Sequence, residues 1–214
     1  MFTGIIEEVG RVTGIAHAKG NRRLTVAATY LVKELKKGDS IAVSGVCLTA
    51  IDITPQSVGF DLAEETWTRT SFSRIREGAL VNLELPMRAD GRFGGHVVQG
   101  HVDGTGIFLG LDPIPDTDNF WLRIEIPSDL ARYVIFKGSL SIEGISLTVA
   151  KVEGAHVTVA IIPHTVEMTN LKALHAGDPV NLEVDMIAKY VEKMMQGESA
   201  NSSLSLEKLV GAGF

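Results

Sequence analysis

Apolar and polar residues alternate in several short stretches of the first half of the chain, and glycine residues separate these stretches. A period of two with many β-branched residues is typical of antiparallel strands that bury one face. The pattern predicts strands over residues 4–15, 23–29, 40–53, 58–62 and 79–85. Residues 54–57, which include Pro55, are predicted to form a hairpin turn.

The second half of the chain repeats the first at an offset of 99 residues. Residues 40–49 (SIAVSGVCLT) correspond to residues 139–148 (SLSIEGISLT), and VNLE at 81–84 returns unchanged at 180–183. Residues 64–70 match 163–169 at this offset, and residues 4–10 match 100–106 at an offset of 96. A repeat of this kind indicates duplication. Five or six strands per half are too few for a sandwich, so each half is predicted to be a small closed Greek-key barrel.

The repeat divides the chain into a first barrel at residues 1–92 and a second at 93–185, joined through a turn-rich linker at 87–95. Residues 30–38 and 128–134 are predicted to form short helices, the first ending at a glycine.

A longer helix is predicted at residues 186–196, followed by a flexible tail at 197–214 that begins with Ser, Asn and Gly. The helix carries an apolar stripe of Ile187, Tyr190, Val191, Met194 and Met195. The stripe fits two interpretations: the helix packs on its own barrels, or it meets copies of itself in an oligomer.

Composition and charge narrow the class of protein. Hydrophobic residues make up 45% of the chain and charged residues 21%, which is ordinary for a globular protein, and the net charge is −6 without a basic run. We therefore expect neither a nucleic-acid nor an anionic-membrane partner. The only cysteine, Cys47, has no intrachain partner, and the first residues lack a basic region followed by an apolar run. Without about 20 consecutive apolar residues, we expect a cytoplasmic protein.

Two common kinds of site are disfavoured by the pattern of residues. His96 and His101 are close in sequence, but a separation of five residues would place them on opposite faces of one strand, and no cluster completes a metal site. The glycine-rich run at 91–95 lacks the Lys-Ser/Thr of a phosphate-binding loop. We read that run as an interdomain turn.

Mismatches between the two copies point to chemistry. Cys47 corresponds to Ser146, so a thiol in one copy replaces a hydroxyl in the other, and either group can bond a ligand or attack it. Both are also consistent with small polar residues at a β-bulge. His101 stands where the first copy has Ile5, although a buried structural histidine is an alternative.

Asp185 corresponds to Pro86, and it immediately precedes the predicted C-terminal helix. An N-cap role is therefore natural for it.

Several longer segments, taken together, resemble riboflavin synthases of the alpha-chain type, a family built on lumazine-binding repeats. These are MFTGII at 1–6, GGHVVQGHV at 94–102, GISLTV at 144–149 and VNLEVD at 180–185, and the resemblance extends to about residue 195. It implies two six-stranded Greek-key barrels and a C-terminal helix that builds a homotrimer. It also implies a transferase that needs no cofactor or metal.

The implied reaction is the last step of riboflavin biosynthesis, a dismutation of two 6,7-dimethyl-8-ribityllumazine molecules. One molecule gives a four-carbon unit to the other, which yields riboflavin and 5-amino-6-(ribitylamino)uracil. Each barrel holds one lumazine, and the productive pair forms between the first barrel of one subunit and the second barrel of its neighbour. The two like substrates play unlike roles, one as carbanion donor and one as acceptor, which fits the mismatches between the copies.

The resemblance also implies which residues form each site. The first site would be lined by Gly4, Ile5, Ile6, Cys47, Leu48, Thr49, Asp61, Leu62, Ala63, Glu64, Glu65 and Thr66, with Phe2 stacked near the ring. The second site would be lined by Gly100, His101, Val102, Lys137, Ser146, Leu147, Thr148, Ala160, Ile161, Ile162, Pro163, His164 and Thr165. Ser146 and Thr148 would carry protons or hydrogen-bond the substrate, His101 would be an acid or base, and Cys47 and Asp185 would assist.

Two other functions fit parts of the pattern. A non-catalytic lumazine or flavin carrier could use the same duplicated barrel, but Ser146, His101 and the apolar stripe are more than a carrier needs. A flavin-dependent reductase with one Greek-key barrel would also need a nicotinamide-binding α/β domain, for which the sequence shows no pattern.

Overall fold

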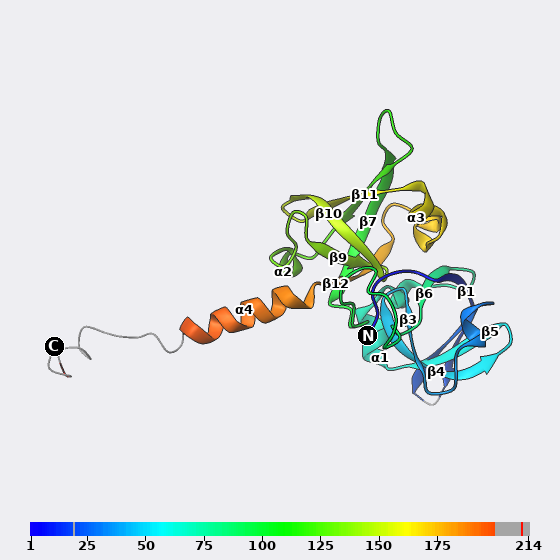
Figure 1. Cartoon of the computed structure of the whole chain (residues 1–214). Coiled ribbons are helices and arrows are strands. Elements are labelled where there is room, and N and C mark those ends of the chain that lie inside the picture. The colour runs from blue at the N-terminus through cyan, green and yellow to red at the C-terminus, as the bar shows by residue number, and fades with distance from the viewer. Residues whose placement is uncertain (19, 200–210, 212–214) are drawn as a thin grey trace.

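Two closed, six-stranded antiparallel barrels follow one another in the chain, and a C-terminal helix projects outward from the second (Figure 1). The structure is a computed structural model that describes residues 1–18, 20–199 and 211. The predicted all-β class, with two tandem Greek-key barrels and one C-terminal helix, is confirmed. The predicted boundary at residues 92 and 93 falls in the irregular linker between β6 and β7.

The two barrels have the same strand order. The first closes because β1 pairs with both β2 and β6, and the second because β7 pairs with both β8 and β12. The strands of the first barrel are β1 (Glu8–Ala18), β2 (Asn21–Ala27), β3 (Ser40–Val43), β4 (Val46–Thr54), β5 (Ser57–Leu62) and β6 (Leu80–Glu84). Those of the second are β7 (Gly104–Pro113), β8 (Phe120–Glu125), β9 (Ser139–Ile142), β10 (Ile145–Glu153), β11 (His156–Ile161) and β12 (Pro179–Val184).

Each barrel has its own hydrophobic core, because alternate residues of each strand point inward. Phe60 and Phe72 are fully buried in the first core, whereas the second is filled mainly by aliphatic side chains such as Leu122 and Ile124. Each such side chain contributes roughly 1.5–3 kcal/mol on burial.

The strand predicted over residues 40–53 is two strands, β3 and β4. Ser44 and Gly45 form the two-residue hairpin loop between them, with φ angles of 44° and 80°, as a type I′ turn requires. The sequence predicts one continuous strand here because the turn lacks the Asn-Gly or Asp-Gly pair that is typical of such turns. The alternative of a bulge at Cys47 and Ser146 is wrong, since the register shifts farther along, between Ala50 and Asp52 and between Val149 and Lys151.

The helical connections differ most from the prediction. They are η1 (Leu31–Lys33), α1 (Glu64–Arg69), η2 (Ser71–Arg74), α2 (Ser128–Ala131), α3 (Pro163–Glu167) and η3 (Asn170–Ala173). The helix predicted at 30–38 is only the three-residue η1, and α1 and α3 were not predicted. Helices this short are held by the barrels they connect, so their own periodicity is a weak signal.

The barrels meet around a close contact between their β-hairpin turns. A side chain on Gly45 would have its Cβ 2.8 Å from the backbone nitrogen of Gly144, so only glycine fits. Beside this contact, Asn82 Nδ2 donates to the carbonyl oxygen of Glu143, and Asn181 Nδ2 donates to that of Ser44, both at 2.9 Å. The asparagine of the repeated VNLE segment therefore joins each barrel to the hairpin turn of the other.

Glu143 breaks the symmetry of this contact, because its counterpart is Ser44. Its carboxyl group is buried and accepts hydrogen bonds from Asn181 N and Asn170 Nδ2, both at 2.7 Å. None of the ion pairs in the described part of the chain involves it. Complete burial therefore raises the pKa of Glu143, and the hydrogen bonds only partly oppose the rise.

Helix α4 (Met186–Ser199) extends beyond the predicted end at residue 196. Its polar face is tied to the second barrel: Lys189 pairs with Asp103 at 2.5 Å, and Glu192 contacts Arg132 at 3.0 Å and the hydroxyl of Tyr133. Apart from residues 197–199 and Gly211, the predicted tail lies outside the described residues. No helix in the described part of the chain is long and apolar enough to cross a membrane.

Burial of Glu143 predicts a specific pH dependence of stability. Because its pKa in the folded protein lies above 4.5, folding favours the protonated form, and this stabilisation is lost as the pH rises from 4.5 through the raised pKa. The free energy of unfolding of the natural chain should fall relative to that of Glu143→Gln over this range. The slope should approach about 1.4 kcal/mol per pH unit. Urea unfolding between about pH 4 and 8 measures it, and parallel curves for the two proteins would contradict it.

Candidate functional site

Two equivalent strands, β4 and β10, each present two small polar side chains on the outside of a barrel. The strands share one alternation of buried and exposed positions. The leucine between each polar pair, Leu48 or Leu147, is buried in its core. Cys47 and Thr49, and likewise Ser146 and Thr148, therefore point outward.

Two segments run between the barrels, and we call them the N-terminal arm (residues 1–6) and the central arm (residues 96–102). They meet where Phe2 and Val98 pair as an antiparallel bridge. The carbonyl oxygen of Gly4 accepts a hydrogen bond from Ser146 N at 2.8 Å, and that of Gly100 accepts one from Cys47 N at 2.9 Å. At its glycine, the N-terminal arm thus contacts the second barrel and the central arm contacts the first.

This crossing corrects the expected composition of the two sites. Gly4, Ile5 and Ile6 were assigned to the first site, but Gly4 touches Ser146 of the second barrel and Ile6 packs on the second core. Residues 100–102 were assigned to the second site, but Gly100 touches Cys47, and Val102 packs on the first core. The repeat correctly shows that the arms correspond to each other. It does not show which barrel each arm contacts.

Glycine is required where each arm touches its strand. Gly4 and Gly100 have φ angles of 76° and 81°, which favour glycine. A Cβ atom on Gly4 would lie 2.7 Å from Ser146 Cβ, and one on Gly100 would lie 2.5 Å from Cys47 Cβ. Each arm therefore forms a close backbone wall beside the polar residue of its strand.

The rim of the first site is acidic and charge-paired. Asp61 near the end of β5 is exposed, as are Ala63, Glu64 and Glu65 just after it, and Thr66 is half-buried. The guanidinium of Arg23 holds both oxygens of Asp61, at 2.8 and 3.0 Å, and lowers the pKa of that carboxyl group. Leu62 was expected to line the site, but it is buried in the core and supports the rim from below.

The rim of the second site is mostly apolar. Ala160, Ile162, Pro163 and His164 are exposed, with Ile162 at 54%, and Thr165 is half-buried. Ile161, like Leu62 in the first barrel, is buried in the core rather than lining the site. Because Ala160, Ile162 and Pro163 are exposed here, the rim of the second site offers more apolar surface than that of the first.

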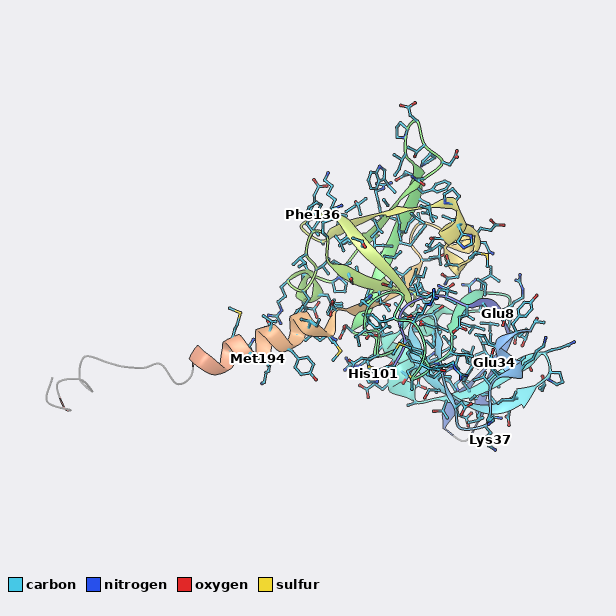
Figure 2. All side chains as sticks on the ribbon, viewed as in Figure 1. Glu8, Glu34, Lys37, His101, Phe136 and Met194 are labelled. Carbon is cyan, nitrogen blue, oxygen red and sulfur yellow. The ribbon has the colours of Figure 1, made fainter. Side chains whose placement is uncertain are left out.

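His101 lies on the arm that contacts Cys47. It follows Gly100 on the central arm, its side chain is exposed near the junction of the barrels (Figure 2), and its backbone nitrogen donates to Glu183 at 3.0 Å. The alternative of a buried structural histidine is therefore wrong. The backbone next to His101 thus lies beside the strand of Cys47, although the repeat had suggested pairing His101 with Ser146.

His96 is the site residue that sequence reasoning missed. Its Nδ1 lies 2.7 Å from Ser146 Oγ, the ring is 8% exposed, and Nε2 has no hydrogen-bond partner in the described part of the chain. Burial lowers the pKa of His96, and the charge of Asp185 opposes this in part. The ring is therefore held neutral, able to exchange a proton with the serine hydroxyl. Its only sequence signal was its place in the GGHVVQGH run.

Three other predicted residues have clear positions. Phe2 is 1% exposed and packs with Ala42, Val98 and Cys47, so it anchors the arms and has no free face for stacking on a ligand. Lys137 is exposed and has a φ of 64°. Asp185 caps α4 by accepting from Ile187 N at 2.9 Å, which confirms its predicted N-cap role.

The described residues contain no group of three or more His, Cys, Asp or Glu side chains that could hold a metal ion. His96 and His101 are on one arm, but His96 is engaged with Ser146, whereas His101 is exposed.

Structural comparison shows the same fold in LumP. Structures of LumP complexed with riboflavin and with 6,7-dimethyl-8-(1'-D-ribityl) lumazine match with TM-scores of 0.78 and 0.77. In both cases the match covers 86% of this chain and 99% of LumP, at 24% and 23% sequence identity. At this identity the likeness shows the fold.

Sequence comparison gives the family. The model of the lumazine binding domain matches twice, at residues 3–86 and 99–185. Riboflavin synthase of Actinobacillus pleuropneumoniae is 44% identical over 100% of both chains, and that of Mycobacterium bovis is 44% identical over 92% of this chain and 98% of its own. Riboflavin synthase of Bacillus subtilis is 38% identical over 95% of this chain and 94% of its own. With its duplicated barrel and two outward binding strands, the chain belongs to the riboflavin synthase family.

Proposed function

We propose that the protein is a transferase that converts two molecules of 6,7-dimethyl-8-ribityllumazine into riboflavin and 5-amino-6-(ribitylamino)uracil. A four-carbon unit moves from one lumazine to the other. Together the two substrates contain every atom of the two products, so the reaction needs no added oxidant or reductant and no cofactor. The only cysteine, Cys47, is a free thiol, which suits the reducing cytoplasm in which we place the enzyme.

The observation that carries this proposal is the pair of equivalent outward strands with unlike chemistry beside them. Each strand has a small polar residue under a backbone wall, which suits two copies of one ligand. In the first site Cys47 is accompanied by His101 and an acidic rim, and in the second Ser146 is accompanied by the buried His96 and an apolar rim. Two identical molecules would therefore meet different groups, as a reaction between unlike roles requires.

The chemistry needs a proton removed from the C7 methyl group of one lumazine and a nucleophile added at C7 of the other. His101 is exposed and can act as an acid or base, whereas Ser146 can pass a proton to or from His96. Thr148 and Cys47 point outward from β10 and β4, and we expect them to contact the same ligands. Asp185 acts at a distance, by holding the start of α4 and placing charge near His96.

Much of the rate should come from holding two rings in one orientation. Orientation of this kind contributes up to roughly 7–11 kcal/mol. The sites lie on the outside of the barrels, so a ring bound there is open on one side and can face a second ring. We propose that the productive pair forms between the first barrel of one subunit and the second barrel of its neighbour.

Helix α4 supports a homotrimer. Its apolar stripe is between 49% and 71% exposed, while its polar face is used for the second barrel. Met194 lies on the part of α4 that stands away from both barrels (Figure 2). Of the two interpretations of the stripe, the structure thus favours contact with copies of the chain. A groove of about 760 Å³ between α4 and residues 132–139 continues this apolar surface.

Turnover with a single substrate tests the proposed function. The purified protein, given only 6,7-dimethyl-8-ribityllumazine, should form riboflavin and the uracil product in equal amounts, as chromatography would measure. Binding of lumazine without any product would instead identify a carrier and would refute the proposal.

The polar residues of the two sites should act mainly on rate. His101→Ala should lower kcat by about 10- to 100-fold, because one proton-transfer group is lost. Ser146→Ala should have a smaller effect, since His96 remains in place. Dissociation constants from fluorescence titration with riboflavin should change by less than about threefold, because the backbone walls that hold the ring are intact. Loss of binding with an unchanged kcat would contradict these roles.

The stripe of α4 predicts how the assembly can be broken. Val191→Glu together with Met194→Glu would place charges in an apolar contact and should dissociate the oligomer. Light scattering should then show one chain of 23.0 kDa in place of three. Lys193→Glu, a charge change outside the stripe, is the matched control and should leave three chains together. A natural chain that is monomeric would contradict the trimer.

A further inference from the structure

Two buried carboxylates lie beneath the crossed arms. Glu84 ends β6 and Glu183 lies at the equivalent place in β12, as the last residue of each VNLE segment. They are 4% and 3% exposed, respectively. The roles described so far for the site use neither of them, although their segment is the one that the repeat preserves unchanged.

Each carboxylate is surrounded by consecutive backbone N–H groups of one arm. Glu84 accepts from Thr3 N at 2.7 Å and from Gly4 N at 3.0 Å, and the hydroxyl of Thr3 adds a bond at 3.1 Å. Glu183 accepts from Gln99 N at 2.7 Å, Gly100 N at 2.9 Å and His101 N at 3.0 Å. A left-handed glycine in each arm turns successive N–H groups toward one point, which makes an anion-binding nest.

The arms and the carboxylates depend on each other. Neither carboxylate is among the ion pairs of the described part of the chain, so the backbone N–H groups hold the negative charge. Burial raises the pKa of both Glu84 and Glu183, and the bonds from the arms oppose this rise. An apolar residue at either position would leave several buried N–H groups without partners.

Because the arms cross, each carboxylate serves the opposite barrel. Glu84 belongs to the first barrel, but it holds Gly4, which bonds to Ser146 of the second. Glu183 belongs to the second barrel, but it holds Gly100, which bonds to Cys47 of the first. We propose that Glu84 and Glu183 are positioning residues, each of which holds the wall of the ligand site on the other barrel. The inference rests on the proposed function in treating these walls as parts of ligand sites.

The test uses Cys47, the only cysteine of the chain, as a reporter of the first site. In the full-length protein, the rate at which a disulfide reagent modifies Cys47 is compared between Glu84→Gln and Glu183→Gln, with and without riboflavin. Glu183→Gln should raise the rate by roughly tenfold and weaken protection by riboflavin, because the three N–H bonds that the carboxylate accepts from the arm are lost or weakened. Glu84→Gln should change the rate less, by under about threefold, because its hydrogen bonds hold Thr3 and Gly4, which lie toward Ser146, and only Phe2 of that arm packs against Cys47.

Exchanging the reporter residue gives the mirror experiment. Cys47→Ser combined with Ser146→Cys moves the only thiol to the second site, where Glu84→Gln should now raise the rate and Glu183→Gln should not. Glu7→Gln is the matched control, since the Glu7 carboxylate lies near Glu84 but accepts from Leu85 N and holds neither arm. It should change neither thiol.

Equal effects on both thiols, or an effect confined to the same barrel, would overturn the proposal, because general loosening gives no crossed pattern. If a glutamine variant fails to fold, hydrogen exchange of the natural protein replaces it. The amides of Gly4 and Gly100 should then exchange as slowly as those of the central strands, and fast exchange would overturn the proposal. None of these measurements requires turnover, so they separate this inference from a failure of the proposed activity.

Discussion

The contact between Gly45 and Gly144 determines the rest of the arrangement. Two hairpin turns approach so closely there that neither can carry a side chain, and Asn82 and Asn181 fasten each turn to the other barrel. Because the turns lead directly into β4 and β10, this contact also fixes the distance and direction between the two binding strands. The arms can cross only because the barrels are held in this relation. The geometry of both sites thus depends on two glycines at the contact between the barrels.

The contact between the barrels is nearly symmetric, whereas the side chains around the two candidate sites differ. The residues that join the barrels are nearly the same in both copies, apart from Glu143 opposite Ser44 and Asn170 opposite Ser71. The residues that face outward differ much more, and the crossing regroups them. The arm that carries His101 contacts Cys47 through Gly100, whereas His96 hydrogen-bonds to Ser146. Duplication supplies two places for one kind of molecule, and the regrouped side chains give each place its own acid–base character.

Much of the fold could be predicted from the sequence because the same strand pattern occurs in both halves of the chain. Alternation located most strands, and the offset between copies showed that both halves share one order. The short helices α1 and α3 were not predicted because they contain too few residues to show a helical pattern. The split at Ser44 escaped because its turn lacks the usual signal. In each case the barrel around the segment, rather than the segment itself, determines the local structure.

Candidate site residues could be selected from the sequence, but their grouping could not. Mismatches between the copies singled out Cys47, Ser146 and His101, whose roles stay predictions. Which arm covers which strand depends on how the two halves pack, and equivalence within a repeat does not determine packing. His96 escaped for the same reason, since only the position of the central arm brings its ring to Ser146. Phe2 was expected against a ligand and instead fills the space where the arms meet.

The crossed arms also bear on how such a duplicated chain can change over evolutionary time. In most tandem duplications one copy is free to drift while the other keeps the original role. Here neither copy has that freedom, because each half supplies a wall for the ligand of the other half. A substitution that loosens one barrel weakens the partner site as well, so selection on either site restrains both halves. The two arms, of six and seven residues, therefore keep the two copies evolving as a single unit.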